Sequence, residues 1–256
     1  MVSVIFLNSF LTNCTPYSFR NFILIGEAMA ICVTDTPRPD KALVAKYQGF
    51  EVATVHEAQG RKGLLADYMR PIYKPAKVAG PAVTCEVAPG DNWMIHVAVE
   101  QCQPGDVLVV KPTSPSVDGF FGDLLATSLK ARGVLGLIIE GGVRDTATLT
   151  AMNFPVWSKS IFSQGCVKET IANVNVPVMC AGAYIRPGDM IVADEDGVVV
   201  VALEEADNVQ TKVEQRMENE ESKRVRFENG ELGLDIYNMR ERLAAKGLVY
   251  VKYNEQ

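Results

Sequence analysis

The sequence is poor in histidine and has no region of concentrated positive charge. Only two histidines, His56 and His96, occur among the 256 residues, so one chain cannot supply a three-histidine zinc site. Lys and Arg total 25 against 31 Asp and Glu, which gives a net charge of −6. Because nucleic-acid binding depends on clustered Lys and Arg, we do not expect this chain to bind nucleic acid.

Cysteine pairs at metal-binding or redox spacing are also absent. The six cysteines include no CxxC pair, and a chain of this length buries a large core without the help of disulfides. We therefore expect reduced, structural cysteines and a cytoplasmic protein.

An unbroken apolar run long enough to cross a membrane is missing as well. Asn8, Asn13 and Pro16 interrupt the apolar residues near the N-terminus, and no positive charge precedes them as in a secretory signal peptide. We expect residues 1–28 to be a disordered extension or a start-site artefact, with Met29 as the true start. A cleaved targeting segment is the alternative. No membrane partner is expected.

From Met29 onward, short apolar strands alternate with helices, which predicts a single α/β domain over residues 29–256. Its layers would form a sandwich of sheet and helices. A C-terminal helical arm is predicted over about residues 203–256, with a charged helix from Leu203 to about Phe227, a turn at Asn229-Gly230 and one short helix. Strands are predicted within residues 78–92, 104–112, 134–142 and 155–161, and several more within 174–201, with a hairpin turn at Asp196-Gly197; helices are predicted within 92–102, 122–133 and 144–153.

Two acidic residues and an arginine are predicted to meet at one edge of the sheet. Asp123 opens a helix after a glycine-containing loop, and Arg144-Asp145 follows the next strand directly. The ends of adjacent strands in α/β sheets are common ligand sites, and free N–H groups at a helix start bind carboxylate or phosphate. Arg144 can bind a carboxylate through two hydrogen bonds. Asp123 and Asp145 can hold a hard divalent cation, directly or through water.

At these residues the chain resembles the class II pyruvate aldolases that cleave 4-hydroxy-4-methyl-2-oxoglutarate and 4-carboxy-4-hydroxy-2-oxoadipate. The most specific feature is an aspartate followed, after twenty residues, by Arg-Asp. Regulators of ribonuclease E share this fold without being aldolases, so a non-catalytic binding protein of the same fold is the alternative. The similar stretches are residues 53–61, 89–101, 112–128, 141–145, 154–160, 174–201 and 233–243.

The resemblance implies a divalent-metal site shared between subunits. Asp145 would ligate Mg²⁺ or Mn²⁺, while Asp123 would act on the cation through water. Glu220, in an Asn-Glu-x-x-Lys stretch of the C-terminal helix, would complete a neighbour's site, also through water. The expected assembly is a homotrimer, or a hexamer built from two trimers.

The resemblance also implies a binding site for the pyruvyl end of a substrate. Arg144 and the amides of Leu124 and Leu125 would bind that end. Further positions near the family's site match Asn92, His96 and Glu57.

The implied reaction is retro-aldol cleavage of a hydroxy-oxo polycarboxylate. Cleavage yields pyruvate, together with oxaloacetate from the oxoadipate, and oxaloacetate decarboxylation is an expected side activity. Such substrates belong to the catabolism of protocatechuate- and gallate-type aromatic acids. A class I mechanism with Lys111 as the Schiff-base residue is a rival, because that lysine ends a strand. Lys159 and Lys168 are candidates to pair with additional substrate carboxylates.

Overall fold

The structure of the protein, a computed structural model, describes residues 29–255. This range contains ten strands. The prediction for residues 1–28 falls outside this range. Eight strands form one curved sheet in the order β1-β6-β5-β3-β2-β9-β10, with β4 paired to β5, and β7 and β8 form a separate hairpin. The strands are β1 (Arg70–Pro71), β2 (Val78–Val87), β3 (Val107–Pro112), β4 (Gly119–Phe121), β5 (Gly136–Val143), β6 (Val156–Ile161), β7 (Val178–Cys180), β8 (Ala183–Ile185), β9 (Met190–Asp194) and β10 (Gly197–Val201).

The centre of the sheet is parallel and covered on both faces. β2, β3, β5 and β6 pair in parallel, with Val109 opposite Ile138 and Ile138 opposite Trp157. Parallel strands buried on both faces consist of nearly continuous apolar residues, and this is why the run from Val107 to Val110 is fully buried. The predicted single α/β domain with a layered sheet is confirmed, and its sheet curves toward a nearly closed barrel.

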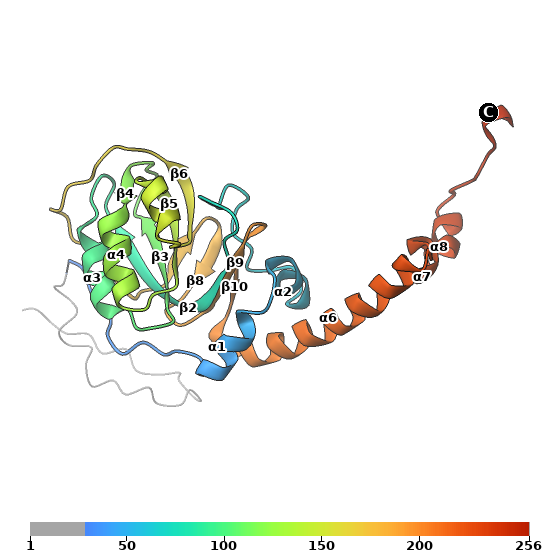
Figure 1. The fold of residues 1–256 in the computed structure, drawn as a ribbon, viewed down its shortest axis with the longest axis horizontal. Helices are drawn as coiled ribbons and strands as arrows, with labels where there is room; N and C mark the ends of the chain where they lie inside the picture. The colour runs from blue at the N-terminus through green and yellow to red at the C-terminus, as the bar shows by residue number, and fades with distance from the viewer. Residues whose placement is uncertain (1–28, 256) are drawn as a thin grey trace, which may run out of the picture.

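Three helices cover one face of this sheet (Figure 1). They are α3 (Trp93–Gln101), α4 (Asp123–Ala131) and α5 (Thr146–Ala151). Their inward residues pack on alternate side chains of β3 and β5, including Leu108, Leu137 and Ile139. This packing fixes the N-terminal turn of each helix near the carboxyl end of the preceding strand.

The other sheet face is covered by the β7–β8 hairpin and by helices near the two ends of the chain. Trp157 lies fully buried there, and its Nε1 donates to the Asp194 carbonyl at 2.7 Å. Helices α1 (Lys41–Tyr47) and α2 (Val52–Ala58) pack with the start of α6 on β9 and β10. The hairpin predicted between β9 and β10 is confirmed, with its two-residue turn at Glu195-Asp196, one residue earlier than predicted, and with Gly197 as the first residue of β10.

The C-terminal arm extends away from the sheet (Figure 1). A 3₁₀ turn, η2 (Leu203–Glu205), precedes the long helix α6 (Ala206–Glu228), so the charged helix begins three residues later than predicted and ends one residue later. Two short helices follow instead of one, α7 (Gly233–Ile236) and α8 (Arg240–Ala245), before the turn η3 (Tyr253–Glu255).

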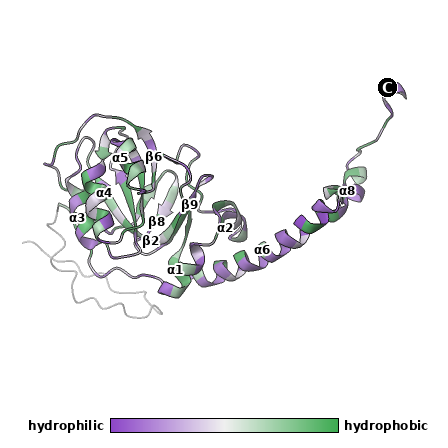
Figure 2. Cartoon of the chain, in the orientation of Figure 1, coloured by the Kyte–Doolittle hydropathy of each residue, from purple (hydrophilic) through white to green (hydrophobic). Residues whose placement is uncertain are grey.

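The buried side chains of α6 all lie in its first two turns, although Arg216 farther along still contacts Glu57 of α2. Its buried residues are Ala206, Val209, Gln210 and Val213, and the remainder is mostly hydrophilic (Figure 2). Apolar side chains farther along, such as Met217 and Phe227, are exposed. Within residues 29–255, no helix has the length and apolar character needed to cross a bilayer.

Candidate active site

The carboxyl ends of β4 and β5 bring the predicted charged residues together. The two strands pair in parallel, with Gly119 opposite Gly142 and Phe121 opposite Val143. Helix α4 begins with Asp123 just beyond β4, and Arg144-Asp145 lies just beyond β5. The Arg144 amide donates to the Phe121 carbonyl at 2.9 Å. The prediction that these charged residues lie at the same end of adjacent strands is therefore confirmed.

Asp145 has an unusual backbone conformation that turns its carboxylate toward α4. Its φ of 58° lies in the left-handed region, which is uncommon for residues other than glycine and is often found at functional sites. Its Oδ2 accepts from the Asp123 amide at 3.3 Å and lies 3.7 Å from Arg144 Nε. The three residues Asp123, Arg144 and Asp145 thus form one contiguous group.

Gly122 leaves room for that carboxylate. A Cβ placed on Gly122 would lie 2.2 Å from Asp145 Oδ2 and 3.3 Å from Arg144 Cγ. Glycine is therefore required here for a close approach between a backbone and a side chain.

Replacing Gly122 with Ala should displace the Asp145 carboxylate. The retro-aldol activity that the sequence resemblance implies should then fall at least tenfold, since misplacing a site group by about 1 Å can cost on the order of a hundredfold. The melting temperature should change little, because the side-chain end can rotate away. As a control, Gly233→Ala on the arm adds a methyl at ordinary van der Waals distance, 3.4 Å or more from its nearest neighbours. Full activity in Gly122→Ala would contradict the required position of Asp145.

A small cavity of about 150 Å³ surrounds this group. The amides of Leu124 and Leu125 lie in the first turn of α4, where N–H groups have no helical carbonyl partner. Gly122 has no side chain to cap them, and Leu124 is 81% exposed. The cavity is lined by Asn92, His96, Phe120, Gly122, Asp123, Leu124, Leu125, Arg144, Asp145 and Lys168.

Asn92 and His96 reach the cavity from the start of α3, as their spacing predicts. Asn92 is only 8% exposed, and its Nδ2 donates to the Phe120 carbonyl at 2.8 Å. Its Oδ1 is buried without a hydrogen-bond partner among the described residues. Burial, and then the charge of Lys168, lower the pKa of His96 below its ordinary value. Both effects favour the neutral form of the His96 imidazole.

The acidic residues of this cavity suit a cation that keeps most of its water. Within residues 29–255, no group of three or more His, Cys, Asp or Glu side chains is arranged to hold a metal. Mg²⁺ is commonly bound through one or two carboxylates and retains several waters. Asp145 and Asp123, with the space kept open by Gly122, fit such a cation.

Known proteins resemble this chain in both sequence and fold. The sequence pattern of RraA-like proteins, described as Aldolase/RraA, matches residues 28–200. This chain belongs to the RraA-like family. A relative from Halalkalibacterium halodurans, named "Putative 4-hydroxy-4-methyl-2-oxoglutarate aldolase", is 32% identical over 76% of this chain and 92% of its own length.

Solved structures of RraA proteins superpose on the same fold. Streptomyces coelicolor RraAS2, described as an unusual member of the RNase ES inhibitor RraA family, is 30% identical with a TM-score of 0.66. The match covers 73% of this chain and 98% of RraAS2. An RNA-processing inhibitor RraA from Thermus thermophilis is 24% identical with a TM-score of 0.55, covering 59% and 92% of the two chains, and supports the fold alone. The predicted RraA-like α/β fold is confirmed.

Two residues matched to the family's site lie outside the cavity of their own chain. Glu220 on α6 and Glu57 on α2 both contact Arg216, whose Nε lies 2.7 Å from Glu220 Oε1 and whose Nη2 contacts Glu57. Neither acid lines the cavity around Arg144. Any role of Glu220 beside Asp123 and Asp145 therefore requires a second subunit.

Lys111, the rival Schiff-base residue, faces away from this cavity. It lies on β3, where its Nζ donates to the Pro112 carbonyl at 2.8 Å and lies 3.7 Å from Glu140 Oε2. Burial raises the pKa of Glu140. Hydrogen bonds from the Ala181 amide and Tyr68, and the positive charges of Lys111 and Lys159, outweigh this effect, so the pKa of Glu140 lies below its ordinary value. Lys111 is thus a half-buried ion-pair partner of Glu140.

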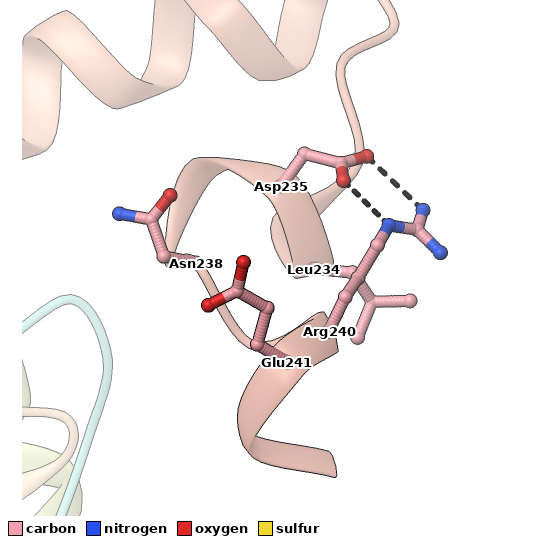
Figure 3. Close-up of a pocket in the computed structure, with 5 residues that line it drawn as sticks. All are labelled: Leu234, Asp235, Asn238, Arg240 and Glu241. Carbon is pink, nitrogen blue, oxygen red and sulfur yellow. Dashed lines mark hydrogen bonds and ion pairs between the residues drawn. The ribbon is translucent and has the colours of Figure 1, made fainter. Parts of the chain in front are cut away.

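A second hollow, on the C-terminal arm, lies between α7 and α8 (Figure 3). Asp235 and Arg240 close one side through two hydrogen bonds of 2.5 and 3.1 Å. Asn238 and Glu241 occupy the other side. This hollow contains none of the residues implicated in chemistry by the sequence.

Proposed function

We propose that this RraA-like protein is a class II pyruvate aldolase, a divalent-metal-dependent carbon–carbon lyase. The observation that carries the proposal is the convergence of Asp123, Arg144 and Asp145 with the open amides at the start of α4. The names of relatives at about 30% identity support an aldolase. The proposed substrates are 4-hydroxy-4-methyl-2-oxoglutarate and 4-carboxy-4-hydroxy-2-oxoadipate, intermediates of aromatic-acid catabolism.

Asp145, and Asp123 through water, would hold Mg²⁺ or Mn²⁺. When bound, the cation supplies Lewis-acid stabilisation of negative charge on the substrate's keto oxygen. Arg144 binds the pyruvyl end and places its guanidinium beside the same oxygen, while the amides of Leu124 and Leu125 bind the carboxylate. Fixed donors aimed at developing charge are usually the largest single contribution to a reaction of this kind.

Cleavage begins with loss of the proton from the hydroxyl on carbon 4, which passes to a water oriented by Asp123. The bond between carbons 3 and 4 then breaks, a carbonyl forms at carbon 4, and the electron pair moves into the pyruvate enolate. Arg144 stabilises the enolate oxygen until carbon 3 takes up a proton. Loss of CO₂ from oxaloacetate forms the same enolate, so we propose decarboxylation as a side activity.

The experiment that tests this function is a coupled assay of pyruvate release from both substrates. Purified protein with Mg²⁺ or Mn²⁺ should release pyruvate from at least one of them. No release from either, under conditions where the protein is folded, would favour the non-catalytic binding protein as the alternative. Borohydride with pyruvate should trap no adduct, whereas trapping at Lys111 would indicate the class I mechanism.

We further propose that the site is completed by Glu220 of a neighbouring subunit, in a trimer or hexamer. The way α6 extends from its own sheet supports a shared site, because Glu220 and the exposed Met217 lie beyond the two turns that carry the buried residues of α6. In the separate chain, Arg216 holds the Glu220 carboxylate.

Mixing two inactive variants should restore activity if the site is shared. Asp145→Ala subunits and Glu220→Ala subunits should each be inactive, and exchange between them should create some interfaces with both residues intact. Part of the activity should then return, measured by pyruvate release after exchange is verified by labelled subunits. Verified exchange without recovery, or an active native monomer in sedimentation, would refute the shared site. Glu218→Ala, which removes an acid two residues away on the same helix, provides the control.

A further inference from the structure

Lys168 places a second positively charged side chain in the cavity that contains Arg144. It lines the cavity together with His96 and Asn92, and its charge acts on the His96 imidazole. Arg144 already lies 3.7 Å from an Asp145 oxygen. Among residues 29–255, no carboxylate lies within 4.0 Å of the Lys168 ammonium. The cavity therefore contains one arginine beside the metal-binding acids and one lysine with no acidic partner in the described chain.

The loop that carries Lys168 is fixed to the start of α3. The Val167 amide donates to the Gly90 carbonyl at 2.9 Å. On the other side of Lys168, the Glu169 and Thr170 amides donate to Asp91 Oδ2 at 2.6 and 2.8 Å. Asp91 is only 2% exposed, so its carboxylate anchors the loop from within the protein. The backbone on both sides of Lys168 is thereby held next to the helix that supplies Asn92 and His96.

We infer that Lys168 binds a second carboxylate of the substrate, the one attached to carbon 4. This inference rests on the proposed function, in which Arg144 and the first turn of α4 hold the pyruvyl end. A lysine ammonium and a carboxylate form a charge-assisted hydrogen bond, which is stronger than one between neutral groups. Lys168 would thus select 2-oxo-4-hydroxy acids whose carbinol carbon bears a carboxylate over those that bear an alkyl group there.

Lys159, the other lysine considered for this role, is placed differently. It extends from β6, and its Nζ lies 5.4 Å from the centre of the Tyr68 ring. Its charge also helps to lower the pKa of Glu140. Lys159 does not line the cavity. Lys159→Met is therefore a matched control in which the same charge is lost outside the site.

The first test compares two cleavage substrates that differ only at carbon 4. These are 4-hydroxy-4-methyl-2-oxoglutarate and 4-hydroxy-4-methyl-2-oxopentanoate, in which a methyl group replaces the carboxylate. Lys168→Met should lower kcat/KM for the dicarboxylate roughly ten- to hundredfold, as expected for loss of a charged hydrogen bond, and leave the monocarboxylate within about threefold. Lys168→Arg should keep most of the preference, because it keeps the charge. An unchanged preference in Lys168→Met would overturn the inference.

The second test measures binding without chemistry. Citramalate carries a hydroxyl, a methyl and a carboxylate on one carbon, and 3-hydroxy-3-methylbutanoate has a second methyl in place of that carboxylate. Titration calorimetry with Mg²⁺ present should show about tenfold or greater preference for citramalate, lost in Lys168→Met and kept in Lys159→Met. If neither oxo acid is cleaved but this dependence is found, the proposed reaction fails while the Lys168 site stands. Equal binding of both compounds by the native protein would overturn the site.

Discussion

Replacing Arg144 with Ala should lower kcat/KM for cleavage by on the order of a hundredfold or more, equivalent to about 2.7 kcal/mol of transition-state stabilisation. The guanidinium is the only cation among the described residues within 4 Å of Asp145, and in the proposed mechanism it stabilises the enolate oxygen. The side chain is about half exposed, so its removal should leave the melting temperature almost unchanged. Steady-state pyruvate release and thermal unfolding measure the two effects separately.

Arg144→Lys should recover little of this loss. A lysine retains the positive charge, but its compact ammonium cannot form the two parallel hydrogen bonds of a guanidinium. Arg132→Ala is the control, because Arg132 lies at the opposite end of α4 and donates to the Glu100 and Cys102 carbonyls. Near-normal turnover by Arg144→Ala or Arg144→Lys would contradict the assigned role.

The sheet and most of the cavity could be predicted because they follow from local patterns. Apolar runs such as residues 107–110 identify buried parallel strands, and a charged residue directly after such a strand must lie at its carboxyl end. Asp123 and Arg144-Asp145 meet for this reason. Asn92 and His96 follow from the spacing of one helical turn. The exact bounds of α6 could be predicted less accurately, because its charged sequence has little apolar periodicity near either end.

Contacts in the site between residues far apart in the sequence could not be predicted from local patterns. Lys168 was recognised only as one of two lysines that suited a substrate carboxylate, and its place in the cavity depends on the anchoring of its loop by Asp91. The close approach of Gly122 to Asp145 also requires a three-dimensional arrangement. Conversely, Glu57 and Glu220 match positions near the family's site, yet in one chain they converge on Arg216. The sequence resemblance matches these positions but does not indicate in which subunit's site each residue would act.

Removal of divalent cations should abolish cleavage, and Mg²⁺ or Mn²⁺ should restore it. The carboxylates of Asp123 and Asp145 offer the hard oxygen donors that these cations prefer, and two histidines per chain are too few for a three-histidine zinc site. After treatment with EDTA and its removal by dialysis, pyruvate release should fall to background and recover on addition of either cation. Full activity in a preparation shown to be metal-free would refute the proposed mechanism.

Thermal unfolding separates metal binding from catalysis in the same experiment. A ligand that binds only the folded state stabilises it by about 2.7 kcal/mol at a hundred times its Kd, so saturating Mg²⁺ should raise the melting temperature of the native protein. Asp145→Asn removes a charged oxygen ligand with almost no change of shape and should abolish this rise. Asp235→Asn, which affects only the arm ion pair with Arg240, should retain it. A magnesium-dependent rise that persists in Asp145→Asn would show that the cation does not need Asp145 and would refute its assignment as the metal ligand.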